Sequence, residues 1–151
     1  MPSADELVTL AMQHVGEKYD WGADVPLEKK NYSGPWDCAE FASWLVYQIS
    51  GQIIGCTDNK SPLKKVEPYS GAWARDAELS TTKITLAQAA LVRGAVLVRK
   101  PKNEKPGHVS ISRGDGTTIE AMDTTHGVAV GKIAGRKWDV CFKIPGVDYA
   151  M

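Results

Sequence analysis

The first apolar pattern in the chain has helical spacing. Ser3 followed three residues later by Glu6 is typical of a capping box, and apolar positions then recur on one face until Gly16. The pattern predicts a helix over residues 4–15. His14 lies on its apolar stripe, where a histidine more often packs and hydrogen-bonds than takes part in catalysis.

Two further segments predict helices. Asp37 is a candidate N-cap for a helix that ends near Gly51, and one apolar face of this helix is formed by Cys38, Phe41, Ala42, Leu45, Val46 and Ile49. Residues 86–92 predict a short third helix, capped by Thr85 with Gln88. Cys38 therefore falls in the first turn of an amphipathic helix and faces the core side.

The segments between these helices are expected to be irregular. Residues 17–35 are rich in Gly, Pro, Asp and Asn, and the segment carries or adjoins Tyr19, Trp21, Tyr32 and Trp36. This composition is typical of a structured loop that walls a groove. Residues 57–82 have no strong periodicity, and we expect an irregular connection there.

After residue 94 the pattern changes to short runs of β-type residues with turn residues between them. The expected strands cover residues 95–99, 108–112, 117–121, 127–133 and 138–144. Helices followed by strands predict an α+β domain, with N-terminal helices packed on a small antiparallel sheet. The chain has no internal repeats or linkers, so we expect one domain over residues 1–151.

Composition narrows the possible partners. The chain has 151 residues, of which 43% are hydrophobic, and 18 basic residues balance 18 acidic ones. A neutral balance does not favour a nucleic-acid partner or an anionic membrane. No apolar run approaches the roughly 20 residues of a membrane-spanning helix, and the start of the chain lacks the pattern of a signal peptide. We expect neither a metal nor a cofactor, since the three histidines have no ligand-type spacing.

One of the three cysteines lies where a nucleophile is expected. The unpaired N–H groups and positive dipole end of a helix N-terminus stabilise a thiolate, and Cys38 has that position. The alternative is a small apolar side chain that fills the space between helix and sheet. Cys56 lies in a turn-like segment and Cys141 in a predicted strand, and we interpret both as packing residues.

A predicted hairpin places a histidine beside a carboxylate. His108 and Glu120 each lie six residues from Gly114, so a hairpin centred on that glycine brings them directly opposite each other on one face. The alternative is a solvated pair on an exposed strand face. Combined with a cysteine at a helix start, the pair matches the nucleophile, base and orienting carboxylate of acyl transfer.

The sequence resembles the NlpC/P60 cysteine peptidases. The motifs that carry this resemblance occur in the family's order and cover most of the chain: YDWG (19–22), WDCAEF (36–41), RGAVLV (93–98), GHVSI (107–111) and GTTIEA (116–121). The resemblance implies a papain-like α+β fold. It also implies hydrolysis of peptidoglycan stem peptides at the bond between γ-D-glutamate and a diamino acid.

The resemblance also implies roles for single residues. The nucleophile is Cys38, the base is His108, and the third polar group is Glu120. Tyr19 matches an active-site tyrosine, and Asp37 matches an aspartate that in relatives can recognise a free N-terminal amine; with Trp36 these form the expected substrate-binding set. The family usually has serine at position 39 and a second glycine at position 23, where this chain has alanine.

These observations leave three readings open. The first is a peptidoglycan hydrolase that acts as a monomer in the periplasm or outside the cell. The second is an amidase or acyltransferase of the same fold with another substrate. The third is a binding module that has lost activity, which the intact set of Cys38, His108 and Glu120 argues against.

Overall fold

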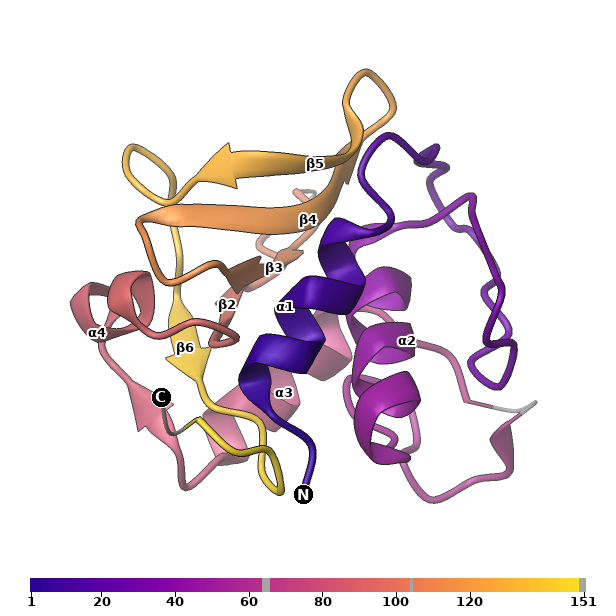
Figure 1. Cartoon of the computed structure of the whole chain (residues 1–151), viewed down its shortest axis with the longest axis horizontal. Coiled ribbons are helices and arrows are strands. Elements are labelled where there is room, and N and C mark those ends of the chain that lie inside the picture. Colours follow the sequence, from indigo (N-terminus) through magenta and orange to yellow (C-terminus); the bar gives the residue numbers. More distant parts are fainter. Residues whose placement is uncertain (64–65, 104, 150–151) are drawn as a thin grey trace.

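A computed structural model describes residues 1–63, 66–103 and 105–149 (Figure 1). The helices are α1 (Ala4–Met12), α2 (Cys38–Ser50), α3 (Ser70–Leu79) and α4 (Leu86–Leu91). The strands are β1 (Lys83–Ile84), β2 (Val96–Arg99), β3 (His108–Ser112), β4 (Thr117–Asp123), β5 (Gly127–Lys132) and β6 (Val140–Phe142). None of the helices in the described ranges combines the length and apolar content needed to cross a bilayer.

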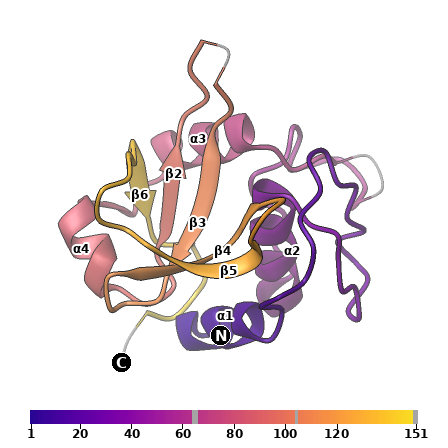
Figure 2. The ribbon, with the colours of Figure 1, turned by 90° about the horizontal axis from the view of Figure 1, so that it is seen from above.

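The six strands form one antiparallel sheet in the order β1-β6-β2-β3-β4-β5. The segment from β2 to β5 is a meander, whereas β6 returns from the end of the chain and inserts between β1 and β2. The sheet is strongly twisted when it is seen from above (Figure 2).

Alternation along the strands divides the core into two parts. Val96 and Val98 of β2 belong to the main hydrophobic cluster, which they share with α1, α2 and α3. Leu97 points to the other face, where it packs in a smaller cluster with Ala89 of α4 and Cys141 of β6. Figures 1 and 2 both show the strands between α2 on one side and α4 on the other. The helices therefore cover both faces unequally, with the larger layer against the side that carries α2.

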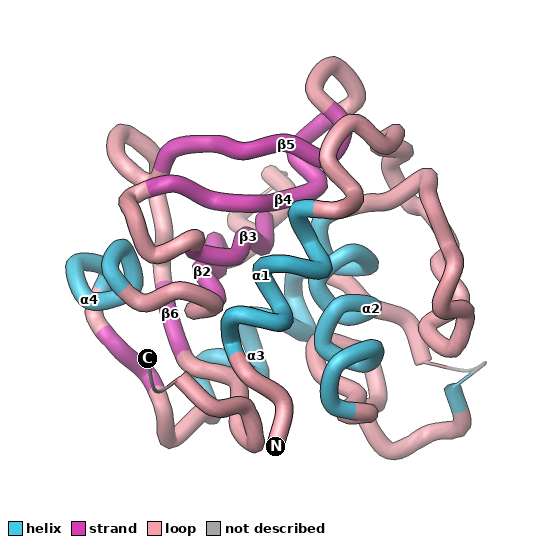
Figure 3. The backbone as a smooth tube through the Cα atoms, in the orientation of Figure 1, coloured by secondary structure: helices cyan, strands magenta, loops and turns pink. Residues whose placement is uncertain are grey.

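Most predicted elements are confirmed, and two were missed. The strand over residues 108–112 and the helices at 38–50 and 86–91 lie where the pattern indicated, and Thr85 and Gln88 form a complete capping box. The first helix is shorter than predicted. The region 57–82 contains α3, and β1 was not expected. The segment between α1 and α2 is an ordered loop, as predicted (Figure 3).

A buried tryptophan links α3 to the first turns of α2. The indole Nε1 of Trp73 donates to Ser43 Oγ at 3.0 Å and to the Ala39 carbonyl at 3.3 Å. Gly55 lies against this ring with φ +75°, and a Cβ at this position would overlap the indole. The glycine therefore permits both a left-handed backbone and the close approach of the ring.

We expect Gly55→Ala to reduce the free energy of unfolding by at least about 3 kcal/mol, because backbone strain and overpacking add. Gly51→Ala is the matched control: its φ is +73°, but nothing lies within 4 Å of the added Cβ. It should cost only about 1 kcal/mol. Urea denaturation of both variants measures the difference, and equal losses would show that Trp73 moves aside freely.

Candidate active site

Cys38 is the first residue of α2, and it is buried. The carboxylate of the N-cap residue, Asp37, accepts a hydrogen bond from the N–H of Glu40 at 2.8 Å. The Cys38 side chain is directed inward as predicted, and the residue is 7% exposed. The backbone N–H of Val109 donates to the thiol, so the sulfur lies against the start of β3, one residue from His108.

The protonation state of Cys38 differs from the sequence prediction. Burial and the nearby charge of Asp37 raise the pKa of the thiol to about 12, and they outweigh the hydrogen bonds from the N–H groups of Val109 and Ala39. The helix start alone therefore does not yield a thiolate at neutral pH. Attack by this sulfur would require a base to remove the proton.

His108 and Glu120 interact, although their register differs from the prediction. The hairpin pairs Ile111 with Ile119 and Ser112 with Thr118, so it is centred on Asp115 and not on Gly114. Along this register Glu120 falls opposite Ser110, and it reaches His108 diagonally, with Oε1 2.7 Å from Nε2. Long side chains span such diagonal positions on one face. Glu120 is 1% exposed, so the pair is not on a solvated strand face.

A third charged group, which sequence reasoning missed, completes this cluster. Both terminal nitrogens of Arg136 donate to Glu120, at 2.8 and 2.6 Å, and the Thr118 hydroxyl also donates to the same carboxylate. The guanidinium lies 4.7 Å from the ring centre of Trp138, which in turn packs 6.1 Å from the His108 ring. Arg136 follows β5 in a turn, and nothing in its spacing relative to Glu120 marks the contact.

These partners determine the charge of Glu120. Burial by itself would raise the pKa of the carboxyl, but the hydrogen bonds from Arg136 and His108 outweigh it and lower the pKa to about 2. Glu120 is therefore a carboxylate at every physiological pH. Because its Oε1 faces Nε2 of His108, the ring proton lies on Nε2 when the imidazole is neutral, and Nδ1 is the basic nitrogen.

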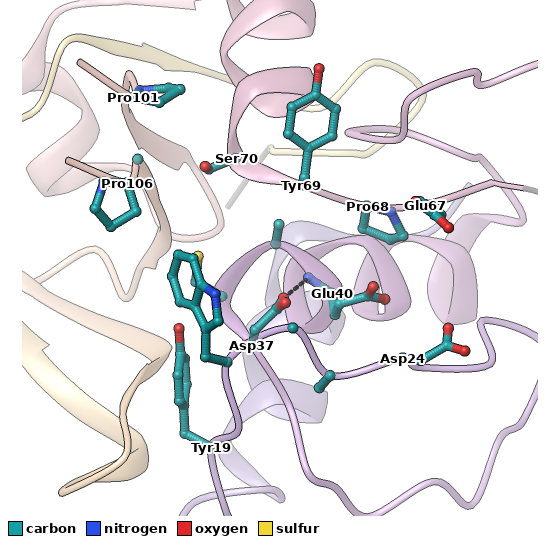
Figure 4. A pocket seen from close by; sticks show the side chains of 16 residues that line it. Tyr19, Asp24, Asp37, Glu40, Glu67, Pro68, Tyr69, Ser70, Pro101 and Pro106 are labelled. Atoms are coloured by element: carbon teal, nitrogen blue, oxygen red, sulfur yellow. Dashed lines mark hydrogen bonds between the residues drawn. The ribbon is translucent and has the colours of Figure 1, made fainter. Parts of the chain in front are cut away.

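Cys38 lies in the wall of a cleft of about 620 Å³. Tyr19 and Asp37 also line it, and Figure 4 shows the Tyr19 hydroxyl directed into the cleft. Burial and the charge of Asp37 raise the pKa of Tyr19, so its hydroxyl stays protonated. Gly107 lines this cleft, whereas the His108 side chain lines a separate hollow with Arg136.

Trp36 does not belong to the substrate-binding surface, contrary to the expectation. It is fully buried: its Nε1 donates to Glu17 at 2.8 Å, and its ring packs edge-on against His14. The exposed aromatic residues in the cleft are Trp21 and Tyr69, which are 69% and 50% exposed. Trp21 belongs to the aromatic loop predicted to wall a groove, but Tyr69 lies in the region predicted to be an irregular connection.

The remaining candidates have structural environments. His14 hydrogen-bonds Glu17 at 2.7 Å within an aromatic cluster, as expected for a packing histidine. Cys56 and Cys141 are buried free thiols outside the cleft. Among the described residues, no three His, Cys, Asp or Glu side chains are grouped so that they could hold a metal ion.

The sequence matches no family model and no curated protein, but solved structures resemble this chain. The NlpC/p60 domain of the peptidoglycan hydrolase SagA has a TM-score of 0.63 and 22% identity, and the match covers 94% of this chain and 99% of that one. For the peptidoglycan hydrolase RipB from Mycobacterium tuberculosis the TM-score is 0.66 and the identity 19%, over 93% of this chain and 64% of that one.

A third similar structure is an NlpC/P60 family protein from Bacillus cereus, with a TM-score of 0.65 and 18% identity over 94% of this chain. The match covers 40% of that protein, so this chain spans well under half of its length. The chain thus has the NlpC/P60 fold. The α+β, papain-like architecture that the sequence motifs implied is confirmed.

We expect Glu120 to make stability depend on pH in the acid range. Its pKa is lowered from 4.5 to about 2. Its contribution is therefore fully present above about pH 4.5 and is lost as pH falls toward 2, an effect of about 3 kcal/mol. Glu120→Gln should be less stable than wild type at pH 6, and the difference should shrink at pH 2.5.

Urea denaturation at several pH values measures this effect. Glu28→Gln, at an exposed position, is the control and should change stability by less than about 0.5 kcal/mol throughout. A difference between wild type and Glu120→Gln that stays constant from pH 6 to pH 2.5 would contradict the assigned charge.

Proposed function

We propose that residues 1–151 form an NlpC/P60 catalytic domain that hydrolyses amide bonds in peptidoglycan stem peptides. Cys38 is the nucleophile, His108 the base and Glu120 the group that orients the base. One observation carries the proposal. In an NlpC/P60 fold, Cys38 lies in a cleft at the start of a helix, and its sulfur lies against Val109. Val109 is the strand residue next to His108, which forms a buried pair with Glu120. SagA and RipB, which have this fold, are peptidoglycan hydrolases.

The chemistry follows from the protonation states. The Cys38 thiol is neutral at rest, so His108 takes its proton through Nδ1 while the sulfur bonds to the carbonyl carbon. The unpaired N–H groups at the start of a helix can stabilise the oxyanion that forms. His108 then protonates the leaving amine, and the C–N bond breaks. Water attacks the thioester and releases the acid, with His108 again as base.

Glu120 and Arg136 act on this sequence through His108. The Glu120 carboxylate accepts from Nε2, which holds the ring and stabilises the imidazolium that forms when Nδ1 takes the thiol proton. Arg136 donates to both oxygens of the same carboxylate and fixes its position. During attack His108 receives a proton from the Cys38 thiol. We therefore assign Glu120 to orientation and charge stabilisation, and not to proton transfer.

The cleft supports the proposed substrate class. Its exposed aromatic residues, Trp21 and Tyr69, offer large flat surfaces in the same cleft as the nucleophile, as ligand-binding clefts commonly do. The bond we assign is that between γ-D-glutamate and a diamino acid. Digestion of purified peptidoglycan with mass spectrometry of the fragments tests it: new amine termini on diamino acids support the assignment, and an intact sacculus would favour another amide substrate.

We expect Cys38→Ala to fold and to lose at least about a thousandfold in turnover, because the thiol is the nucleophile. Cys56→Ser and Cys141→Ser are the controls and should keep most activity, since both thiols lie outside the cleft. Release of muropeptides from peptidoglycan measures activity, and circular dichroism verifies folding. Activity of Cys38→Ala within a few-fold of wild type would exclude the assigned nucleophile.

We expect Asp37→Asn to weaken cleavage of stem peptides with a free N-terminal L-alanine more than cleavage of N-acetylated ones. A carboxylate forms a charge-assisted hydrogen bond with an ammonium, which an amide cannot replace. Asparagine still caps the helix, so stability should change little. Burial raises the pKa of Asp37 to about 6, so the preference for the free amine should appear as pH rises through 6. Equal losses on both peptides would leave Asp37 as a cap alone.

A further inference from the structure

The fold separates charges that balance over the whole chain. Basic and acidic residues count 18 each, yet the charged residues that line the cleft beside Cys38 are all acidic: Asp24, Asp37, Glu40 and Glu67. Two further hollows, of about 510 and 380 Å³, have the opposite character. Besides His108, their charged residues are seven basic ones and two acidic ones: Arg99, Lys100, Lys102, Lys105, Lys132, Arg136 and Lys137 against Asp123 and Asp139. The hollows therefore carry a net positive charge.

The β2–β3 hairpin borders both kinds of surface. Its two arms project beyond the sheet (Figure 2), and the backbones of Lys102 and Lys105 join them through hydrogen bonds of 3.0 and 2.9 Å. Pro101 and Pro106 of the hairpin line the acidic cleft, as Figure 4 shows, whereas its lysines line the larger basic hollow. Pro106 lines both, so the basic hollow shares a wall with the cleft.

Five of the basic residues are free to bind a ligand. Among the described residues, no carboxylate forms an ion pair with the five that we call the basic strip: Arg99, Lys102, Lys105, Lys132 and Lys137. The other two are engaged, because Lys100 pairs with Glu78 and Arg136 pairs with Glu120. The four lysines of the strip are exposed, so a large ligand can reach them.

The basic strip is too long for one small anion. Arg99 lines both hollows and joins them, so the strip extends from Lys132 of β5 to the lysines of the hairpin. In the sheet, β5 and β2 are three strand spacings apart, which is roughly 14 Å. A row of unpaired like charges over such a length favours a ligand that carries several negative charges in a row.

The composition of the strip selects between kinds of polyanion. Its four lysines are compact point charges, which suit the single charges of separate phosphates, whereas planar carboxylates favour the fork of arginine. Among the described residues that line either hollow, only the buried His108 has an aromatic ring, so the bases of a nucleic acid would have nothing to stack on. A flat bilayer does not fill a concave hollow.

We propose that the basic strip binds a linear polymer of the cell wall with phosphodiester repeats and thereby holds the enzyme beside its substrate. The choice of a wall polymer rests on the proposed function. The acidic cleft repels such a polymer, so a chain bound along the strip leaves the cleft open for the peptide.

Binding of a defined polymer tests the proposal. The probe is fluorescently labelled poly(glycerol phosphate), prepared from lipoteichoic acid by removing its lipid and its D-alanyl esters, and anisotropy measures its affinity in 50 mM salt. Lys102→Gln, Lys105→Gln and Lys137→Gln together should weaken binding at least about tenfold, because most of the free cations are lost. Arginine at the same three positions keeps the charge and should bind within about twofold of wild type.

A matched triple variant separates the strip from net charge. Lys29→Gln, Lys30→Gln and Lys60→Gln together remove the same charge from exposed positions outside both hollows. This variant should bind within about twofold of wild type, since it keeps every contact to phosphate. Equal weakening by the two glutamine triples would overturn the proposal, because net charge alone would then explain binding.

Competing ligands and salt identify the partner. Raising salt from 50 to 200 mM should weaken polymer binding at least about tenfold, and an affinity that salt leaves unchanged would contradict binding to phosphates. Single-stranded DNA of the same charge and vesicles of phosphatidylglycerol with phosphatidylcholine are the competitors. Tighter binding of either one than of poly(glycerol phosphate) would replace the proposed partner with a nucleic acid or a membrane.

Activity separates docking from catalysis. None of the three hairpin-side lysines lines the cleft, so Lys102→Gln, Lys105→Gln and Lys137→Gln together should cleave L-Ala-γ-D-Glu-L-Lys within about twofold of wild type. The same variant should digest polymer-bearing walls at least about fivefold more slowly, because docking raises the local concentration of enzyme, and acid-stripped walls at the wild-type rate. Loss of tripeptide cleavage with an unchanged melting temperature would place the lysines in the substrate site and refute docking.

The binding assay does not depend on hydrolysis, so the inference and the proposed function can fail separately. If wild type cleaves no peptidoglycan but binds the polymer through the strip, the inference stands and the proposed function fails. If wild type cleaves peptidoglycan and does not bind the polymer, the inference is overturned and the proposed function stands.

Discussion

The need to neutralise one buried carboxylate organises the part of the molecule that carries the candidate site. Glu120 is almost fully buried on β4, and it is stable there because His108 comes from β3 and Arg136 from the turn after β5. Removing one partner from a buried charge cluster leaves an uncompensated charge, which is costly. The same pairing that lets the sheet tolerate the charge also fixes the imidazole, so stability and the orientation of His108 depend on one contact.

Local sequence signals predicted most of the fold, whereas the site depends on contacts that no local signal encodes. Caps and apolar spacing were sufficient for α2 and α4, whose backbones hydrogen-bond within each helix, and a short run of β-type residues was sufficient for β3. The helix α3 was missed because Tyr69 provides no side-chain cap and because three of its five apolar residues are alanines, which give only a weak apolar pattern. The hairpin register was two residues off, since turn length and not symmetry about Gly114 determines pairing.

The candidate site was predicted in part for the same reason. Cys38, His108 and Glu120 lie in motifs, but the roles of Arg136 and Tyr69 depend on loops that only tertiary structure places. Trp36 illustrates the converse, because a motif residue next to the site turned out to be a core residue. The acidity of the cleft could not be read from composition, since the total charge is balanced and only the fold gathers the carboxylates.

The position of β6 has a consequence for how the protein can be made. The last strand in the chain lies between β1 and β2, so both of those strands have an open edge until residues 140–142 arrive. Asp148 also accepts from the N–H of Ala4, which ties the first helix to the end of the chain. During synthesis the sheet therefore cannot close before residues 140–142 have left the ribosome. Until then, the unpaired strand edges are exposed to other chains. This is the period in which protection by a chaperone matters most.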